Sequence, residues 1–294
     1  MVRKYLVNRK FDLLAVLSVV MVLFLAGCGK TTSARASSGT TASSLTHASN
    51  SAIPSATLKH MPYGTATVSW DPVSKGLTVK IALTGMAPNS THPAHIHAGS
   101  CVKQGAVEYP LHNVDADAHG VGSSTTVIKN VTTLPASGWS IHVHNGPGLA
   151  PADQFLPIAC SDLTFTKISP AKMMSEQVLL NAAPGSDASE TASGTAHLTL
   201  SGSTLTVKLT LSGLQPKSSH AANIHAGSCA SQGPVVYPLQ NVVADALGNA
   251  NVTTTIKNVS SIPSRNWYVS VHYSTDLSTQ TGFNPIACGN VVVG

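Results

Sequence analysis

The chain has 294 residues, of which 10% are charged and 5% aromatic, and its formal net charge is +5 at pH 7. Residues 1–27 hold four basic groups and one acidic group, a net +3, which leaves +2 (five minus three) for the remainder. So small a charge, without a basic stripe that alternates with aromatic residues, excludes the electrostatic surface typical of nucleic-acid-binding proteins.

The N-terminus is typical of an exported lipoprotein. Basic residues up to Lys10 precede an apolar run over 13–25, which ends in the sequence LAGC at Cys28. This order predicts a secretory signal peptide over 1–27, and the run is shorter than the about 20 residues of a membrane span. LAGC resembles a bacterial lipobox, which implies lipidation of Cys28 and an extracytoplasmic protein that is lipid-anchored to the bacterial cell membrane. An uncleaved anchor with a chance cysteine is the alternative.

The segment that follows is predicted to be a flexible tether. Residues 28–57 are mostly Ser, Thr, Ala and Gly, with few large apolar side chains. Such a composition cannot bury enough surface to offset the entropy of ordering the chain. We expect this tether to hold the folded part away from the lipid surface.

The rest of the sequence is a tandem repeat. Residues 77–160 align with 205–288 at a constant offset of 128, without a gap and with about half of the positions identical. We expect one domain over 58–165, a linker over 166–190 and a second domain over 191–294, because each copy has the length of an ordinary domain. Within the linker, Val178–Leu180 is a candidate strand.

Both copies have the pattern of an all-β fold. Large apolar residues alternate with polar or small ones from Leu77 to Leu83 and again from Trp139 to His144, the period expected of strands with one buried face. Turn-forming residues separate these stretches, and no long helical period interrupts them. The sequence therefore predicts two tandem Greek-key β-barrel or sandwich domains.

The cysteines predict one disulfide in each domain. With Cys28 assigned to the lipobox, four cysteines remain, and they form two pairs that are 59 residues apart. Even numbers of cysteines in an exported protein favour disulfides, and the repeat selects Cys101–Cys160 and Cys229–Cys288 from the three possible pairings. Each bond should stabilise its domain by about 4 kcal/mol.

Two histidines beside a cysteine suggest a metal site in the first copy. Residues 93–101 read PAHIHAGSC, whereas 221–229 read AANIHAGSC. Residues i and i+2 of a strand share a face, so His95 and His97 should project together while Ile96 faces the core. A third imidazole from a neighbouring strand would complete a copper or zinc site. The second copy keeps His225 but has Asn223 in place of the other histidine.

The wider pattern resembles the copper/zinc superoxide dismutase family. HIHAGSC, QG, YP, a D…G turn, SIHVH and PIAC occur in that family's order and spacing. The resemblance implies an eight-stranded Greek-key barrel in each copy and supports the same disulfide pairing. It places His95, His97 and His144 at three of four copper-ligand positions. Val107 stands at the fourth position, and Pro157 stands where the family has the arginine that guides superoxide.

These matches imply copper in the first domain and argue against zinc, whose histidines are not recognisable. His142 shares a strand face with His144, and His92 lies on a nearby loop, so both are additional candidate ligands. His92 recurs in the second copy as His220, which equally suits a hydrogen-bonded loop histidine. The second copy would hold a degenerate site made of His225 and His272.

Three functions fit the sequence. The first is a cell-surface lipoprotein that binds copper in its first domain and has little or no dismutase activity. The second is an active copper-dependent superoxide dismutase, if a nearby histidine replaces the missing ligand. The third is a non-catalytic structural or adhesive surface module. No catalytic residue is assigned, and apart from the membrane and a metal ion the sequence identifies no partner.

Overall fold

The computed structural model describes residues 53–166, 168–182 and 191–293. The predicted signal peptide, the lipidation site Cys28 and the tether up to residue 52 lie outside these residues. Within them the protein is all-β, as predicted, and its helices are two single turns, α1 (Ala152–Phe155) and α2 (Gln280–Phe283). No helix of this part of the chain is long and apolar enough to span a membrane.

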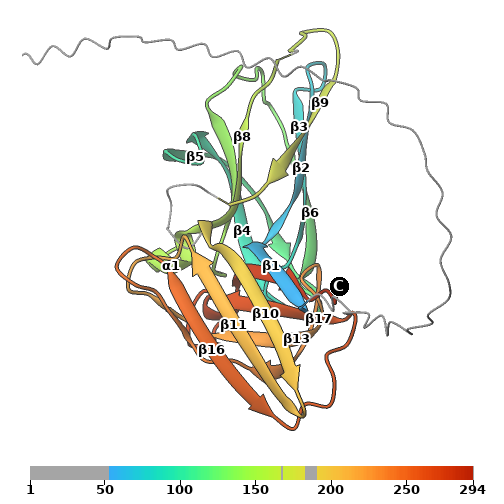
Figure 1. The fold of residues 1–294 in the computed structure, drawn as a ribbon. Coiled ribbons are helices and arrows are strands. Elements are labelled where there is room, and N and C mark those ends of the chain that lie inside the picture. Colours follow the sequence, from blue (N-terminus) through green and yellow to red (C-terminus); the bar gives the residue numbers. More distant parts are fainter. Residues whose placement is uncertain (1–52, 167, 183–190, 294) are drawn as a thin grey trace, which may run out of the picture. The chain divides into compact units, whose positions relative to one another are not determined.

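The first repeat folds into two four-stranded antiparallel sheets, an arrangement consistent with a β-sandwich (Figure 1). One sheet has the order β6-β3-β2-β9 and the other β5-β4-β7-β8. Their strands are β2 (Tyr63–Asp71), β3 (Gly76–Thr84), β4 (Thr91–Gly99), β5 (Gln104–Asp115), β6 (Val121–Ile128), β7 (Trp139–His144), β8 (Pro157–Leu163) and β9 (Met174–Leu180).

The second repeat forms one curled antiparallel sheet of eight strands, in the order β14-β13-β17-β18-β1-β10-β11-β16. A short pair, β12 with β15, lies beside it. The strands are β1 (Ser55–His60), β10 (Ser193–Ser201), β11 (Thr204–Ser212), β12 (Ser219–His220), β13 (Ala222–Ser228), β14 (Ser231–Pro238), β15 (Val242–Val243), β16 (Ala250–Lys257), β17 (Trp267–His272) and β18 (Pro285–Asn290).

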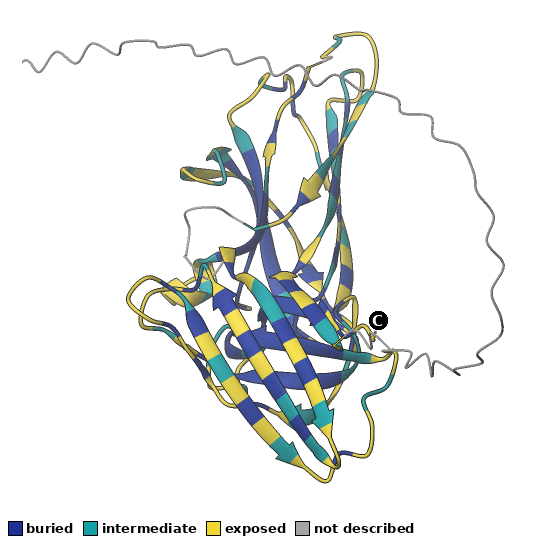
Figure 2. Cartoon of the chain, viewed as in Figure 1, coloured by how far each residue is buried: buried dark blue, intermediate teal, exposed yellow. Residues whose placement is uncertain are grey.

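The alternation of the sequence accounts for these strands and for the two cores. Leu77, Val79, Ile81 and Leu83 of β3 are each at most 2% exposed, while Lys80 between them faces solvent. The same alternation of buried and exposed residues is visible along β10, β11 and β16 (Figure 2). Each repeat has its own cluster of buried apolar side chains, so each strand contributes one face to a core, as its period requires.

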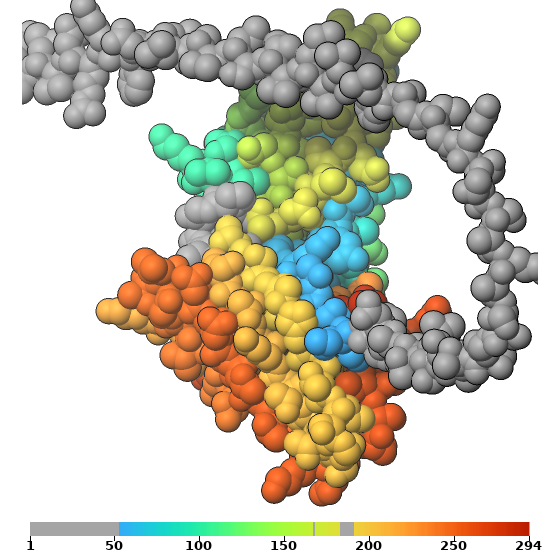
Figure 3. Space-filling view, viewed as in Figure 1, coloured from blue at the N-terminus to red at the C-terminus, as the bar shows by residue number. Residues whose placement is uncertain are grey.

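The sheets depart from the repeat boundaries at two strands. β1 precedes the first repeat in sequence, yet it lies between β18 and β10 of the second, and Ala56 and Leu58 belong to the second core (Figures 1 and 3). β9 precedes the second repeat, yet it pairs with β2 of the first, and Leu180 belongs to the first core. β1 begins at Ser55, inside the segment expected to be tether, and β9 includes the candidate strand of the linker.

The two repeats thus have the same strand order, with β1 in the second taking the place that β9 has in the first. Next to β9, Asn181 pairs with Cys160 of β8, just as β1 pairs with β18. Side chains also cross between the repeats. Asn284 Nδ2 donates to the carbonyl of Asn145 at 2.8 Å, and Gln232 Nε2 donates to the carbonyl of Met86 at 2.7 Å. Each repeat therefore depends on the other for one strand and for buried hydrogen bonds.

Both predicted disulfides are present. Cys101–Cys160 and Cys229–Cys288 each join Cα atoms 5.9 Å apart, within the range that a disulfide spans without displacing the backbone. Each bond ties the loop after one strand (β4 or β13) to the strand two places along the same sheet (β8 or β18). The strand between the two tied segments is β7 or β17, which carries histidines.

Candidate metal centre

Four histidines of the first repeat share one face of the sheet β5-β4-β7-β8. β4 and β7 are antiparallel neighbours in which His95 lies opposite His142 and Ile96 lies opposite Ile141. The isoleucines are fully buried in the core of the repeat. Because side chains alternate along a strand, His95 and His97 of β4 and His142 and His144 of β7 project from the other face.

Three of these imidazoles converge on one point. His95, His97 and His144 each offer one ring nitrogen, and these three nitrogens lie within 4.8 Å of one another. The ring centroids are 5.1 to 5.7 Å apart. Bonds of about 2.0–2.1 Å to one metal ion would place the nitrogens about 3.4 Å apart. The structure thus brings together the three residues that the sequence singled out, and side-chain rotations would have to bring their nitrogens closer for them to hold one ion.

Backbone carbonyls hold two of the rings in a defined tautomer. His97 Nδ1 lies 3.0 Å from the Gly105 carbonyl, and His144 Nδ1 lies 2.5 Å from the Phe155 carbonyl. A carbonyl can only accept, so each Nδ1 carries the proton and each Nε2 keeps its lone pair. This is the arrangement in which metal-binding histidines are commonly held. His144 Nε2 and His95 Nδ1 are buried and have no hydrogen-bond partner among the described residues.

Burial also keeps the rings neutral. Desolvation lowers the pKa of His144 to about 4 and lowers those of His95 and His97 below their usual value. The neighbouring rings add to the effect at His144 and at His95, because a second positive charge nearby would be unfavourable. At neutral pH the three nitrogens are therefore unprotonated, which is the state that binds a metal ion.

Two further contacts of the trio were not expected from the sequence. The Phe155 ring stacks on His144, with centroids 4.9 Å apart. Gln104 Nε2 lies 3.2 Å from His97 Nε2, so this amide has to move when His97 binds a metal. The repeated QG block at Gln104-Gly105 and Gln232-Gly233 is the signal that could have found Gln104, and the match of Phe155 with Phe283 is the one that could have found Phe155. A side chain at Gly105 would also clash, since a Cβ there would lie 2.7 Å from the Ala98 carbonyl oxygen.

The additional candidates His142 and His92 lie outside the trio. His142 is fully buried, and its ring centroid is 4.8 Å from that of His97, but its Nε2 is hydrogen-bonded to Ser140 Oγ at 3.0 Å. Both nitrogens of His92 are used. Nδ1 lies 2.8 Å from the His144 carbonyl and Nε2 lies 2.7 Å from Ser90 Oγ. His92 therefore supports the backbone of His144.

The second repeat keeps the scaffold of the site with two histidines. His225 Nδ1 lies 3.0 Å from the Gly233 carbonyl, and His272 Nδ1 lies 2.6 Å from the Phe283 carbonyl, as at the matching positions of the first repeat. Both Nε2 atoms are buried without a hydrogen-bond partner in the described part of the chain. Asn223 replaces the third histidine, so this pair keeps the orientation of the trio and lacks one of its ligands.

Two other substitutions change the surroundings of that pair. Tyr268 stands where the first repeat has Ser140, and its ring stacks on His225 with centroids 4.9 Å apart. Ser270 stands where the first repeat has His142. The Tyr268 ring thus takes the place of the Ser140 hydroxyl, and the Ser270 hydroxyl takes the place of the His142 imidazole. His119 reaches the same region from the first repeat and lines a cavity of about 420 Å³ together with His225.

Comparison with protein families corrects the resemblance inferred from the sequence. A CHRD domain model matches residues 170–276, from just before β9 to just after β17 and thus less than half of the chain. No model of the copper/zinc superoxide dismutase family matches, so that assignment is wrong. The motifs behind it describe a histidine-bearing strand beside a disulfide-bonded strand, which is local geometry and does not identify a family. No curated protein matches the chain.

Proposed function

We propose that the protein binds one copper ion in its first repeat through His95, His97 and His144. The observation that carries the proposal is the convergence of three neutral imidazoles whose nitrogens lie within 4.8 Å of one another. Two of the rings are oriented by backbone carbonyls, and buried nitrogens of His95 and His144 lack a hydrogen-bond partner in the described residues. Burying such groups unpaired is costly, and a bound metal ion would remove that cost.

The donor set favours copper over other divalent ions. All three ligands are imidazoles, and nitrogen sites bind Cu²⁺ more tightly than Zn²⁺ or the earlier metals of the series. When bound, copper would supply a redox-active or Lewis-acidic centre. His95, His97 and His144 would bind the ion, and the backbone carbonyls of Gly105 and Phe155 orient the rings of His97 and His144. Dismutase activity followed only from the superseded resemblance and is not part of the proposal.

We further propose that this site lies outside the cytoplasm, on a protein anchored by a lipid at Cys28. The LAGC sequence after an apolar segment supports export. The two disulfides agree with an oxidising compartment. A copper-binding surface lipoprotein would take up or buffer copper at the cell envelope. A structural surface module is the second candidate, and the two-histidine site of the second repeat favours it for that repeat.

Copper stoichiometry tests the proposal. The mature chain from residue 28, with Cys28→Ser to avoid lipidation, should retain one copper ion per molecule after gel filtration, measured by elemental analysis. His95→Asn should weaken copper binding by more than about 100-fold, since even the outer hydrogen-bond partners of metal ligands contribute 10–100-fold. His197→Asn changes an exposed histidine of β10 and is the matched control. Equal copper retention by His95→Asn and the control would disprove the site.

A further inference from the structure

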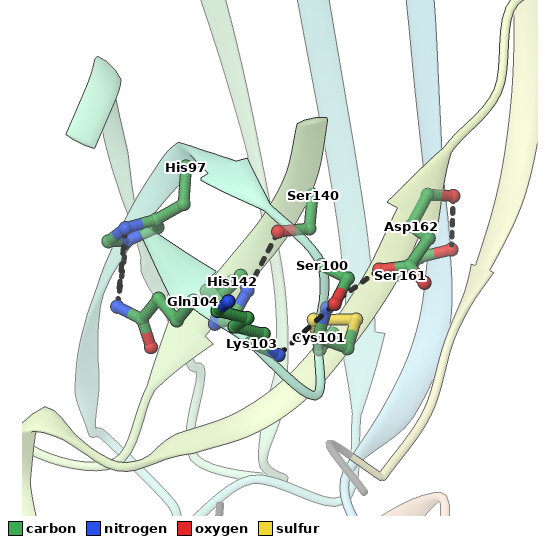
Figure 4. The surroundings of a disulfide bond; sticks show 10 residues. His97, Ser100, Cys101, Lys103, Gln104, Ser140, His142, Ser161 and Asp162 are labelled. Atoms are coloured by element: carbon green, nitrogen blue, oxygen red, sulfur yellow. Dashed lines mark hydrogen bonds between the residues drawn. A yellow bond between two sulfur atoms is a disulfide. The ribbon is translucent and has the colours of Figure 1, made fainter. Parts of the chain in front are cut away.

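A second group of metal-ligand atoms lies directly beside the trio. One ligand atom each of Cys101, Cys160 and His142 lie within 4.8 Å of one another. His142 lies opposite Cys160 in the pairing of β7 with β8, so the ring and the disulfide are neighbours on one face of the sheet. Figure 4 shows His142 between His97 and the disulfide, with its hydrogen bond to Ser140.

His142 has an unused donor atom at this place. Its side chain is fully buried, and Nδ1 has no hydrogen-bond partner among the described residues. Nε2 is 3.0 Å from Ser140 Oγ, which can accept a hydrogen bond from its N–H. In that tautomer Nδ1 holds the lone pair.

We propose that reduction of the Cys101–Cys160 disulfide creates a second metal site, formed by the two thiolates and His142. Its ligand would be a thiolate-preferring d¹⁰ ion such as Cu⁺, Zn²⁺ or Cd²⁺. A dithiol supplies the two electrons and two protons that convert the disulfide into two thiols, and is itself oxidised to a disulfide. Each thiol then loses its proton to solvent as its sulfur binds the ion.

The geometry suits both steps. Cys101 is half-buried, so a reductant can approach it from solvent, whereas Cys160 is 3% exposed and keeps the site shielded. Metal–sulfur bonds of about 2.3 Å separate two thiolates of a tetrahedral site by about 3.8 Å. Side-chain rotation allows that separation with the present Cα distance of 5.9 Å. The redox state of the disulfide would then set how many metal ions the first repeat holds, one when oxidised and two when reduced.

The second repeat provides an internal control. Its disulfide, Cys229–Cys288, occupies the same place in the sheet, but Ser270 stands at the position of His142. Reduction there gives two thiolates without the imidazole. The new site shares no ligand with the copper trio, so it does not depend on copper binding by His95, His97 and His144.

Cadmium binding to the mature Cys28→Ser chain tests the proposal. A phosphine reduces the disulfides, takes up the oxygen of a water molecule and does not itself contribute a thiolate. After reduction the chain should bind Cd²⁺ with the ultraviolet thiolate-to-cadmium charge-transfer band, which the oxidised chain should lack. His142→Ser should weaken this binding by more than about 100-fold, and Ser270→His should add a second tight equivalent. His95→Asn should keep the band, which separates this site from the trio.

Three results would overturn the proposal. The first is unchanged cadmium affinity in His142→Ser, and the second is the same band in the oxidised chain. The third is loss of the β-sheet circular dichroism on reduction, because the site would then not be preformed. If His142→Ser does not fold, the Ser270→His variant tests the proposal instead. Binding of a second cadmium ion by that variant supports the site, and failure to bind one contradicts it.

Discussion

The two repeats have the same strand order and the same disulfide position, yet their histidine faces differ at three positions. His95, Ser140 and His142 of the first repeat are replaced by Asn223, Tyr268 and Ser270 in the second. The core behind these residues is fully buried in both, with Ile96 and Ile224 equally inaccessible. The chemistry of the site is thus carried by one face of one sheet, and the fold does not require it.

What both repeats retain is equally informative. His97 and His225 donate to glycine carbonyls at 3.0 Å, and His144 and His272 donate to phenylalanine carbonyls at 2.5 and 2.6 Å. These contacts join β4 to β5, β13 to β14, and β7 and β17 to the single-turn helices α1 and α2, so they help the fold whether or not a metal is bound. In the copper site proposed for the first repeat, such an oriented pair is completed by a third imidazole, which the second repeat lacks. The comparison therefore separates residues that orient the site from residues that complete it.

The largest expected difference between the repeats is their loss of stability in acid. Burial lowers the pKa of five histidines on the sheet of the first repeat, to about 4 for His92 and His144, to about 3 for His142 and below the usual value for His95 and His97. In the sheet of the second repeat it lowers the pKa of His60 and His272 to about 4 and lowers that of His225. Each unfolded histidine takes up a proton near pH 6.5. The stabilisation is therefore complete above pH 6.5 and is lost as the pH falls toward 4, by about 3 kcal/mol for each histidine whose folded pKa is about 4.

The metal-free first repeat should consequently unfold at a higher pH than the second. Hydrogen exchange resolved by peptide, at pH 7, 5.5 and 4.5, measures each repeat in the intact chain. After correction for the intrinsic exchange rate, peptides of β4 and β7 should lose protection before those of β13 and β17. Simultaneous loss in both repeats would show that the additional histidines do not determine the acid sensitivity.

The exchanged strands predict mutations that act on the distant repeat. Leu58 of β1 is 1% exposed in the second core, and Leu180 of β9 is fully buried in the first. Leu58→Ala and Leu180→Ala should each cost about 2–5 kcal/mol, the usual range for a buried leucine. Denaturant-dependent hydrogen exchange should show the loss from Leu58→Ala in the second repeat and from Leu180→Ala in the first. The reverse assignment would contradict the strand pairing.

Much of this fold could be predicted from the sequence, because alternation is a local signal. The residues from Leu77 to Leu83 indicate a strand without knowledge of its neighbours, and the equal cysteine spacing indicates both disulfides. The place of β1 could not be predicted. Residues 55–60 read SATLKH, and which sheet accepts such a strand depends on packing in the folded protein.

The site was predictable to the same degree. Side chains such as His95 and His97 are visible in the sequence, and the strand period places them on one face. The acceptors that orient His97 and His144 are main-chain carbonyls of Gly105 and Phe155, and a main-chain acceptor has no signature of its own in the sequence. The family resemblance was wrong because it interpreted this local arrangement as evidence of ancestry. Geometry and family are separate inferences here.

Restoring the missing imidazole should extend copper binding to the second repeat. Asn223→His would place a third ring beside His225 and His272, whose Nε2 atoms are already buried without a partner in the described residues. The gain should be about 100-fold in affinity, and the copper content of the mature chain should rise from one to two. Adding Tyr268→Ser tests whether the stacked ring obstructs the ion. If both variants still hold one copper ion per chain, three imidazoles with rings oriented by backbone carbonyls are not enough to bind copper.

The smallest effect concerns the two glutamines of the QG blocks, which have different tasks. Gln104 Nε2 lies 3.2 Å from His97 Nε2 and competes with the metal ion, whereas Gln232 Nε2 donates to the buried Met86 carbonyl of the other repeat at 2.7 Å. Gln104→Ala should therefore raise copper affinity, by less than about tenfold, because a net hydrogen bond of about 0.5–1.5 kcal/mol no longer has to be broken. Gln232→Ala should leave copper affinity unchanged and lower the free energy of unfolding by about 1–3 kcal/mol, because it leaves a buried acceptor unpaired.

Competition with a chromophoric copper chelator measures the change in copper affinity, and urea unfolding measures the change in the free energy of unfolding. A lower copper affinity in Gln104→Ala would mean that this amide supports His97 and does not compete for it.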